Sequence, residues 1–256
     1  MILSSTIYDL LLTECRKDRR GKSISVDEYN QVIEKVNLEL FADYYREFEK
    51  NIESSDTLGG LKVFHSPVVL TAGENNTVAV GTLPADYYHI IGKPKFISGS
   101  TVRWLDVVST YEHAARVTDY LTQATATHPY CMIGGLDDDA AKEIRVYPYN
   151  LGTPIYLDYL KTPATPFLDY YINNTTFNYT WLDADDTAVN IPAGYTYRDG
   201  TVGGPAVNID SATVNFEWSE DDLPLIIAKL MTVMGIQLPD EILMQAGTLN
   251  ENKILR

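Results

Sequence analysis

Histidine and acidic side chains are the groups in this chain that could bind a metal ion or transfer protons. The four histidines are His65, His89, His113 and His128, and no two of them form an H-x-x-x-H or H-E-x-x-H pair. A position on the surface or at the end of a strand is the simpler interpretation of each one. We therefore expect no metal site built on histidine.

Other motifs of catalysis and cofactor binding are also missing from the sequence. Asp137, Asp138 and Asp139 follow Gly134 and Gly135, but the run lacks the spaced oxygen ligands of a calcium loop and indicates a solvated hairpin tip. No phosphate-binding G-x-x-x-x-G-K-[ST], dinucleotide-binding G-x-G-x-x-G or nucleophilic G-x-S-x-G motif is present. We expect no cofactor and no nucleophilic catalyst.

Paired carboxylates are the remaining route to catalysis, because two acids on an aromatic-rich β-scaffold can hydrolyse a glycosidic bond. Glu112, Asp158 and Asp186 are the candidates for such a pair. In a chain with 35 acidic residues a pair can always be chosen, so the pattern has little specificity. A carbohydrate-binding or glycan-degrading protein stays the alternative, and the sequence favours a protein that is not an enzyme.

A basic cluster near the N-terminus is the clearest local departure from the chain's acidity. It contains five of the 20 Lys and Arg residues, namely Arg16, Lys17, Arg19, Arg20 and Lys22. One interpretation is a docking contact with an acidic partner surface, which would fix orientation through charge complementarity. The other is a solvated helix end.

The overall composition excludes several classes of protein. A formal charge of -15 and a pI near 4.6 argue against sequence-independent binding of nucleic acid, which needs cationic surface, although sliding contact with DNA is compatible with them. Cys15 and Cys131 lie far apart and predict no disulfide framework. No run approaches the ~20 apolar residues of a membrane span, so we expect a soluble protein made inside the cell.

The longest helical pattern, from Ser25 to about Ile52, positions the rest of the chain. Ser25 and Glu28 have the spacing of a capping box, and apolar residues follow at helical intervals. Towards its end the apolar stripe widens to include Phe41, Tyr45 and Phe48. The wider stripe predicts either a second face that contacts a neighbouring subunit or a single wide core face.

Helices are expected at both ends of the chain and strands between them. A first helix begins at Ser4 or Ser5, short helices are expected at Leu83–Tyr88 and from Thr110 to about Leu121, and the last helices begin near Asp221–Asp222 and at Pro239. Strand patterns occur at 61–69, 78–80, 90–97, 102–108, 130–133, 144–147, 155–160 and 214–218.

The segment Asp169–Asp210, which we call the arm, differs from its surroundings in composition. It contains six aspartates, one arginine and no lysine, with aromatic and polar residues in alternation. This pattern predicts a β-hairpin arm inserted into the β-domain. Tyr and Trp are favoured at interfaces, so the arm's expected contact residues are Tyr179, Trp181, Tyr195 and Tyr197.

The predicted fold class is α+β. A helical bundle is expected from residues 1–57 with 219–256, and an antiparallel β-domain from 58–168 with 211–218. The arm, 169–210, is expected as an insertion.

Four passages, read together, resemble virion structural proteins of crAss-like and related tailed phages, and more distantly the tail-tubular or gatekeeper proteins of short-tailed phages. They are Ile7-Tyr8 through Arg19–Asn30, then Leu83–Tyr88, then Ile144–Pro148 with Leu160–Pro166, and Phe216–Trp218 through Gly235–Ile236. These are scaffold passages rather than catalytic signatures, and the likeness covers nearly the whole chain except the arm.

The resemblance implies a subunit of a head–tail connector or tail ring, dodecameric in such an assembly, that joins portal to tail and lines the DNA channel. The implied partners are copies of the chain itself, the portal protein, the adjacent tail ring or tail proteins, and channel DNA in non-specific contact. The implied location is the virion, and the family contributes no catalytic residues. An acidic channel would repel phosphate and let DNA slide, which agrees with the charge of the chain.

Overall fold

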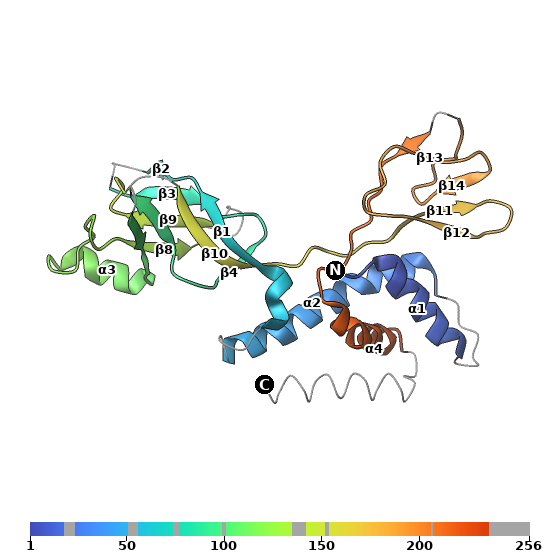
Figure 1. Cartoon of the computed structure of the whole chain (residues 1–256), viewed down its shortest axis with the longest axis horizontal. Helices are drawn as coiled ribbons and strands as arrows, with labels where there is room; N and C mark the ends of the chain where they lie inside the picture. The colour runs from blue at the N-terminus through green and yellow to red at the C-terminus, as the bar shows by residue number, and fades with distance from the viewer. Residues whose placement is uncertain are drawn as a thin grey trace. The chain divides into compact units, whose positions relative to one another are not determined.

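The computed structural model describes residues 1–17, 24–50, 56–73, 77–98, 101–134, 142–151, 154–205 and 207–235. Within them the chain is a mixed α+β protein with four α-helices and several antiparallel sheets (Figure 1). It divides into two compact units. Met1–Gly60 with Pro163–Arg256 form the first, which we call the terminal unit, and Leu61–Thr162 form the second, the central unit.

Helix α2, Val26–Lys50, is the longest element of the terminal unit and begins as its sequence predicts. The Glu28 amide donates to Ser25 Oγ at 3.2 Å, and the Ser25 amide donates to Glu28 Oε2 at 3.1 Å. The capping box is therefore confirmed, because both of its reciprocal hydrogen bonds are present.

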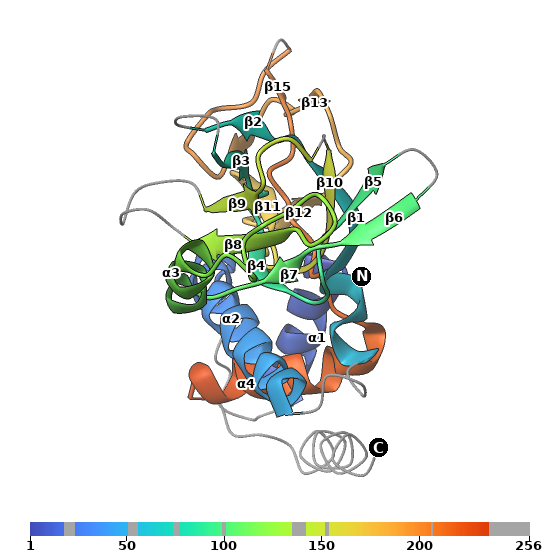
Figure 2. The same ribbon diagram turned by 90° about the vertical axis from the view of Figure 1, so that its left-hand side faces the viewer.

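The other helices of the terminal unit pack against α2 and against each other. Helix α1 spans Ser4–Lys17, and α4 spans Leu223–Val233 after a short 3-10 turn at Glu220–Asp222. Figure 2 shows α1, α2 and α4 together as ribbons. Their buried faces are apolar, and a polar contact lies among them, where the Trp218 indole donates to Asn37 Oδ1 at 2.7 Å. Gly235, at φ 67°, follows α4, as expected of a helix stop.

The arm also lies in the terminal unit and forms two small sheets. Strands β11 (Asp169–Asn173), β12 (Tyr179–Leu182) and β14 (Tyr195–Tyr197) pair in the order β12-β11-β14. Strands β13 (Val189–Asn190) and β15 (Asn208–Ile209) make a separate antiparallel pair.

The central unit contains two five-stranded sheets. In the first, the order is β1-β10-β5-β6, and β4 also pairs with β10. In the second, the order is β2-β3-β9-β8-β7, with β7 and β8 parallel. The strands are β1 (Lys62–Val68), β2 (Thr71–Ala72), β3 (Ala79–Thr82), β4 (Tyr87–Ile90), β5 (Lys95–Ser98), β6 (Thr101–Trp104), β7 (Asp106–Val107), β8 (Tyr130–Gly134), β9 (Glu143–Tyr147) and β10 (Ile155–Lys161).

The core of the central unit lies between these sheets, because both contribute buried residues to one cluster. Phe96 and Leu157 come from the first sheet, and Cys131, Ile144 and Val146 come from the second. Helix α3, Thr110–Thr118, follows β7, and none of its side chains is buried.

The division of the chain differs from the expected domains around the arm. The arm and residues 163–168 and 211–218 belong to the terminal unit and not to the β-domain. Contacts explain this placement: the Tyr170 hydroxyl donates to Asp27 Oδ1 at 2.8 Å, and the Asn30 side chain bonds both backbone groups of Leu168. In addition, the Tyr8 and Trp181 rings meet edge to face with centroids 5.1 Å apart.

Some local expectations were wrong. Leu83–Tyr88 forms a turn leading into β4, with the Tyr87 amide donating to the Pro84 carbonyl at 3.0 Å, and not a helix. Residues 214–218 make isolated bridges to Phe167 and Ile2 within the terminal unit rather than a strand of the β-domain. Helix α3 ends at Thr118, before the expected Leu121. The expected helix at Pro239 lies outside the described residues.

None of the helices in the described part of the chain is long and apolar enough to cross a membrane.

Candidate interaction surfaces

Large apolar side chains are exposed mainly on the central unit. They gather on strands β5 and β6, on helix α3 and on the turn that follows it. The exposed members are Ile97, Val102, Trp104, Tyr111, Val117, Tyr120 and Leu121. Concentrated apolar exposure of this kind marks a surface that contacts another molecule.

The open edge of the first sheet is one of these surfaces. Strand β6 ends the order β1-β10-β5-β6, and the described residues include no strand beyond it. Val102 is 50% exposed and Trp104 is 55% exposed, and neither carries a charge that would block a pairing strand. The strand therefore offers both backbone groups and apolar side chains to a partner.

The exposed face of the same sheet is organised by a row of side chains across three strands. Lys95 pairs with Tyr156 of β10 on one side and with Trp104 of β6 on the other. The Lys95 ammonium lies 5.6 Å from the centre of the Trp104 ring, and it bonds Asp158 Oδ2 at 3.4 Å. These contacts hold the lysine over the sheet and orient the indole.

A bulge in β1 completes this face. His65 has a positive φ of 60°, and its amide donates to Asp158 Oδ1 at 2.7 Å. Its imidazole stacks on Tyr156 with ring centres 4.1 Å apart. One face of Tyr156 is therefore already covered within the chain.

Helix α3 is attached to the second sheet by a small group of polar and aromatic side chains. His113 Nδ1 lies 3.1 Å from the Tyr130 hydroxyl, and its ring lies 4.6 Å from that of Tyr147. The Arg116 guanidinium lies 5.2 Å from the centre of the Tyr130 ring and bonds Glu112 at 2.6 Å. The helix is begun by Ser109, whose Oγ accepts from the Glu112 amide.

The other side of α3 and the following turn point to solvent. Tyr111 and Tyr120 are each 87% exposed, and Leu121 is 89% exposed. A nine-residue helix with no buried side chain gains little from packing on its own unit. Such a helix is typical of an element that packs against a partner.

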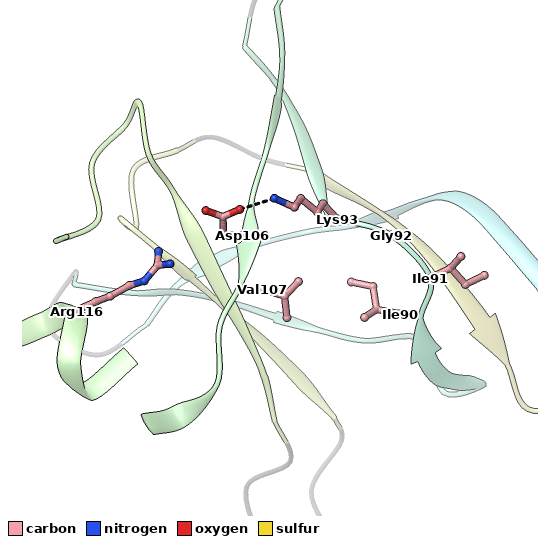
Figure 3. A pocket seen from close by; sticks show the side chains of 7 residues that line it. All are labelled: Ile90, Ile91, Gly92, Lys93, Asp106, Val107 and Arg116. Atoms are coloured by element: carbon pink, nitrogen blue, oxygen red, sulfur yellow. Dashed lines mark hydrogen bonds and ion pairs between the residues drawn. The ribbon is translucent and has the colours of Figure 1, made fainter. Parts of the chain in front are cut away.

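A pocket of about 550 Å³ opens between α3 and the ends of strands β4 and β7 (Figure 3). Ile90, Ile91 and Val107 supply its apolar lining, and Lys93, Asp106 and Arg116 supply the charges. The hydrogen bond from Lys93 to Asp106, 2.7 Å long, lowers the pKa of that carboxyl. The acid is therefore held as the ionised partner of an ion pair.

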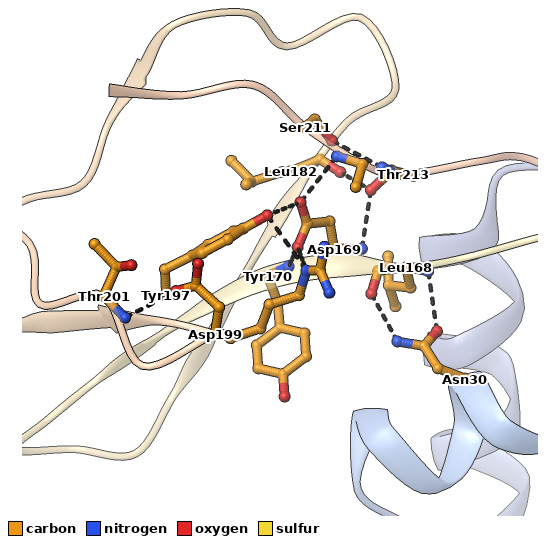
Figure 4. A network of polar contacts seen from close by, with 12 residues as sticks. Asn30, Leu168, Asp169, Tyr170, Leu182, Tyr197, Asp199, Thr201, Ser211 and Thr213 are labelled. Carbon is orange, nitrogen blue, oxygen red and sulfur yellow. Dashed lines mark hydrogen bonds and ion pairs between the residues drawn. The ribbon is translucent and has the colours of Figure 1, made fainter. Parts of the chain in front are cut away.

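The arm is organised around the buried carboxylate of Asp169 (Figure 4). Its Oδ1 accepts from the Tyr170 amide at 3.0 Å and from Arg198 Nε at 2.7 Å. Its Oδ2 accepts from the Tyr197 hydroxyl at 2.6 Å and from the Ala212 amide at 2.9 Å. Four donors therefore satisfy two oxygens, which is what a buried carboxylate requires.

Thr213 extends this network to the neighbouring strand. Its Oγ1 accepts from the Asp169 amide at 2.9 Å and donates to the Leu182 carbonyl. Burial, followed by the bond to Asp169, raises the pKa of Tyr197. For Arg198, burial lowers the pKa, but the contacts with Tyr197 and Asp169 outweigh it and leave the pKa raised. Both side chains keep their protons as donors to this network.

Several of the residues predicted as contacts are either outside the described residues or buried in the terminal unit. Of the basic cluster, Arg19, Arg20 and Lys22 lie outside the described residues, as do the side chains of Arg16 and Lys17. Phe41 and Phe48 are buried, and Tyr45 between them is half-buried and stacks on both. Of the two interpretations of the widened stripe, the burial favours a wide core face.

The four aromatic residues predicted as contacts in the arm are placed differently from one another. Tyr197 is buried on Asp169, Trp181 is half-buried against Tyr8, and Tyr195 packs on Tyr171. Tyr179 is the most exposed of the four, at 39%. Tyr179 lies on β12, which is an edge strand of the arm's three-stranded sheet.

The candidate catalytic acids are engaged in local structure. Glu112 pairs with Arg116, Asp158 pairs with Lys95, and Asp186 Oδ2 accepts from the Asp183 amide at 2.8 Å. Within the described ranges no cluster of three or more His, Cys, Asp or Glu side chains could hold a metal ion. Residues 137–139 lie outside those ranges.

The sequence did not single out Trp104, Tyr111, Tyr120 and Leu121, which are large apolar residues that the structure exposes. They lie within patterns that predict ordinary buried strands and helices. One signal was present for α3, where Ala114 and Ala115 leave a short helix with few large side chains for a core.

In comparisons with known proteins, no protein-family model matches the chain, and no curated protein matches it.

Proposed function

We propose that the chain is a structural subunit of a phage head–tail connector or tail ring, dodecameric when assembled, that joins portal to tail and lines the DNA channel. In this proposal α1, α2 and α4 belong to a helical bundle, and the arm reaches a neighbouring subunit or tail protein. The protein is a virion component without catalytic activity. Its partners are further copies, the portal, the adjacent tail proteins and channel DNA.

One observation carries this proposal: exposed apolar side chains gather on β5, β6 and α3 of a chain with a net charge of -15. A chain so acidic repels its own copies, so association needs places where apolar contact outweighs repulsion. The same acidity suits a channel through which DNA slides. The sequence resemblance supports this proposal independently of the surface.

The α3 surface is suited to the portal or to an adjacent ring protein. Its exposed residues include two tyrosines, which are favoured anchors of protein interfaces. Replacing Tyr111, Tyr120 and Leu121 with Ser removes the anchors without touching the His113 and Arg116 contacts that attach the helix. We expect this variant to fold normally and to lose attachment to its partner.

The experiment is native mass measurement of the purified chain, alone and with its portal, for the wild type and the triple Ser variant. A ring of the wild type bound to portal supports the proposal. Phe64 supplies the matched control, because it is 65% exposed on the same unit but lies on β1. If the wild type forms no ring and binds no portal, the proposed function is rejected.

The alternative is a carbohydrate-binding or glycan-degrading tail component. Trp104 and Tyr156 on an open sheet face, beside Asp158, are the observation that favours it. His65 stacks on Tyr156 and Lys95 lies over Trp104, which leaves less aromatic surface for a sugar. Binding or turnover of a glycan, lost on Trp104→Ala, would favour this alternative.

A further inference from the structure

We infer that edge strand β12 of one copy pairs with edge strand β6 of the next copy, so that the arm of each subunit adds to the central unit of its neighbour. This inference rests on the proposed function, since it names the surfaces by which the subunits join. It follows from three features: open edges on both strands with outward backbone groups and exposed apolar side chains, opposite charge on the two edges, and the symmetry that this charge pattern requires.

The first feature is the direction of the backbone groups on β6. The Leu105 amide donates to the Pro94 carbonyl, and alternate residues of an antiparallel pair bond their partner strand. Counting back along the register, Arg103 faces β5, whereas Val102 and Trp104 turn their N–H and C=O groups to the open edge. Val102 and Trp104 are also the two exposed apolar residues of β6.

Strand β12 has the same arrangement. The Asn173 amide donates to the Asn178 carbonyl, so Thr180 faces β11, and Tyr179 and Trp181 turn their backbone groups outward. Strand β12 ends its sheet in the order β12-β11-β14, and the described residues place no further strand against it. Phe177, just before the strand, is 74% exposed. Each edge therefore presents two outward backbone pairs with aromatic side chains beside them.

The second feature is charge. Residues 92–105, which contain β5 and β6, carry Lys93, Lys95 and Arg103 and no acid, within a chain of net charge -15. Lys93 pairs with Asp106 and Lys95 pairs with Asp158, so Arg103 is the cation that the described residues of this segment leave without an acidic partner. The arm carries six aspartates and one arginine. Asp183 and Asp185, both exposed, follow β12 directly. Arg103 on β6 and the aspartates after β12 attract each other, whereas two copies of either edge bring like charges together.

The third feature is the symmetry that this charge pattern requires. Pairing β6 with β6, or β12 with β12, would join like charges across a two-fold axis. Pairing β12 with β6 is head to tail, because the two surfaces lie on different units of each copy. Contacts of this kind generate closed rings or open filaments. Addition of a strand to an open edge is a recurrent mode of protein recognition.

Two proline variants test the pairing. Proline removes an N–H group and is tolerated in an edge strand when that N–H faces outward, as at Val102, or at the first residue of a strand, as at Tyr179. We expect Val102→Pro and Tyr179→Pro each to keep the wild-type circular dichroism spectrum. We expect each variant to weaken self-association at least tenfold in sedimentation velocity. Self-association of the wild type should also weaken at high salt, because salt screens the attraction between the two edges.

Mixing the two variants distinguishes head-to-tail pairing from every other arrangement. The Val102→Pro chain keeps an intact β12, and the Tyr179→Pro chain keeps an intact β6. Each variant alone should stay monomeric, and an equimolar mixture should form a one-to-one dimer through the single intact junction. Phe64→Ser and Val202→Ser remove exposed apolar side chains away from both edges and should assemble as the wild type does.

If a proline variant loses its fold, Trp104→Ser and Phe177→Ser replace it, since both change exposed side chains and leave the backbone unaltered. Self-association equal to the wild type in the variants overturns the inference, even if rings still form on the portal and the proposed function stands. Wild type that stays monomeric at roughly millimolar concentration also overturns it. Variants defective only towards the portal would assign the edges to that partner and reject a second copy.

Discussion

Replacing Asp169 with Ala should destabilise the terminal unit more than any exposed acidic substitution in the arm. The carboxylate is fully buried, and it accepts from the Tyr170 and Ala212 amides, the Tyr197 hydroxyl and Arg198 Nε. Alanine would leave these four donors without their acceptor and Arg198 without its partner charge.

The magnitude follows from the cost of breaking a buried charge pair by removing one partner, which is about 3–5 kcal/mol. Asparagine should recover only part of this loss. The asparagine side chain has one oxygen, which can accept from the two donors that bond one of the carboxylate oxygens, and its NH₂ group then faces the two donors of the other. If the NH₂ group takes the place of Oδ2, it opposes the Ala212 amide, at a cost of about 1–3 kcal/mol for an unsatisfied N–H.

The assay is urea unfolding followed by the fluorescence of Trp181 and Trp218, which lie in the terminal unit, in a Trp104→Phe background that removes the signal of the central unit. Two compact units need not unfold together, so the two transitions are fitted separately. We expect the terminal transition to move to lower urea. The central transition, read as the signal that is gained when Trp104 is kept, should keep its midpoint.

Asp185→Ala is the matched control, because this aspartate is exposed in the same arm and its loss changes the net charge equally. It should change the free energy of unfolding by less than about 0.5 kcal/mol. A double-mutant cycle of Asp169→Ala with Arg198→Ala should show coupling between the two residues. If Asp169→Ala costs no more than the control, the network does not organise the arm.

Three further outcomes are expected. Burial raises the pKa of the Cys131 thiol from 9.0 to about 12 and that of Tyr87 from 10.0 to about 12. Both groups therefore ionise at lower pH in the unfolded chain than in the folded one, and the stability of the fold should decrease between pH 9.0 and about 12. Alkaline titration with tyrosinate absorbance checks this, and a flat profile would contradict it. Asn37→Ala should cost about 1–3 kcal/mol in urea unfolding because the buried Trp218 N–H loses its acceptor, whereas exposed Gln31→Ala should be nearly neutral. Changing the five residues of the basic cluster to Gln should keep the melting temperature, because exposed charge pairs contribute only about 0–1 kcal/mol each; these residues are Arg16, Lys17, Arg19, Arg20 and Lys22. The same change should weaken incorporation of the subunit into particles, as added salt should also do. Equal incorporation of variant and wild type at low salt would show that the cluster is only a solvated helix end.

Local chemistry in the sequence was enough to predict the elements whose signals act over a few residues. The capping box of Ser25 and Glu28 predicted the start of α2 because both hydrogen bonds close within one turn. Strands β8, β9 and β10 followed from short β-branched and aromatic runs between turns. The α+β class followed from these elements.

The placement of the arm was decided only by tertiary contacts. Alternating aromatic and polar residues predict strands, but they do not say which domain the strands pack on. Tyr170 reaches Asp27, and Leu168 bonds Asn30, over separations of 143 and 138 residues. Long-range partners of this kind leave no local pattern. The sequence therefore predicted the arm as an insertion into the β-domain, whereas the arm groups with the terminal unit.

Exposure was likewise decided by tertiary structure. Phe41 and Phe48 on α2 and Trp104 on β6 are all large aromatic residues in regular patterns, yet two are buried and one is open to solvent. Whether a face of a helix or strand is covered depends on which element packs beside it. The sequence determined which residues are apolar and how they repeat, and the fold determined which of them remain for a partner.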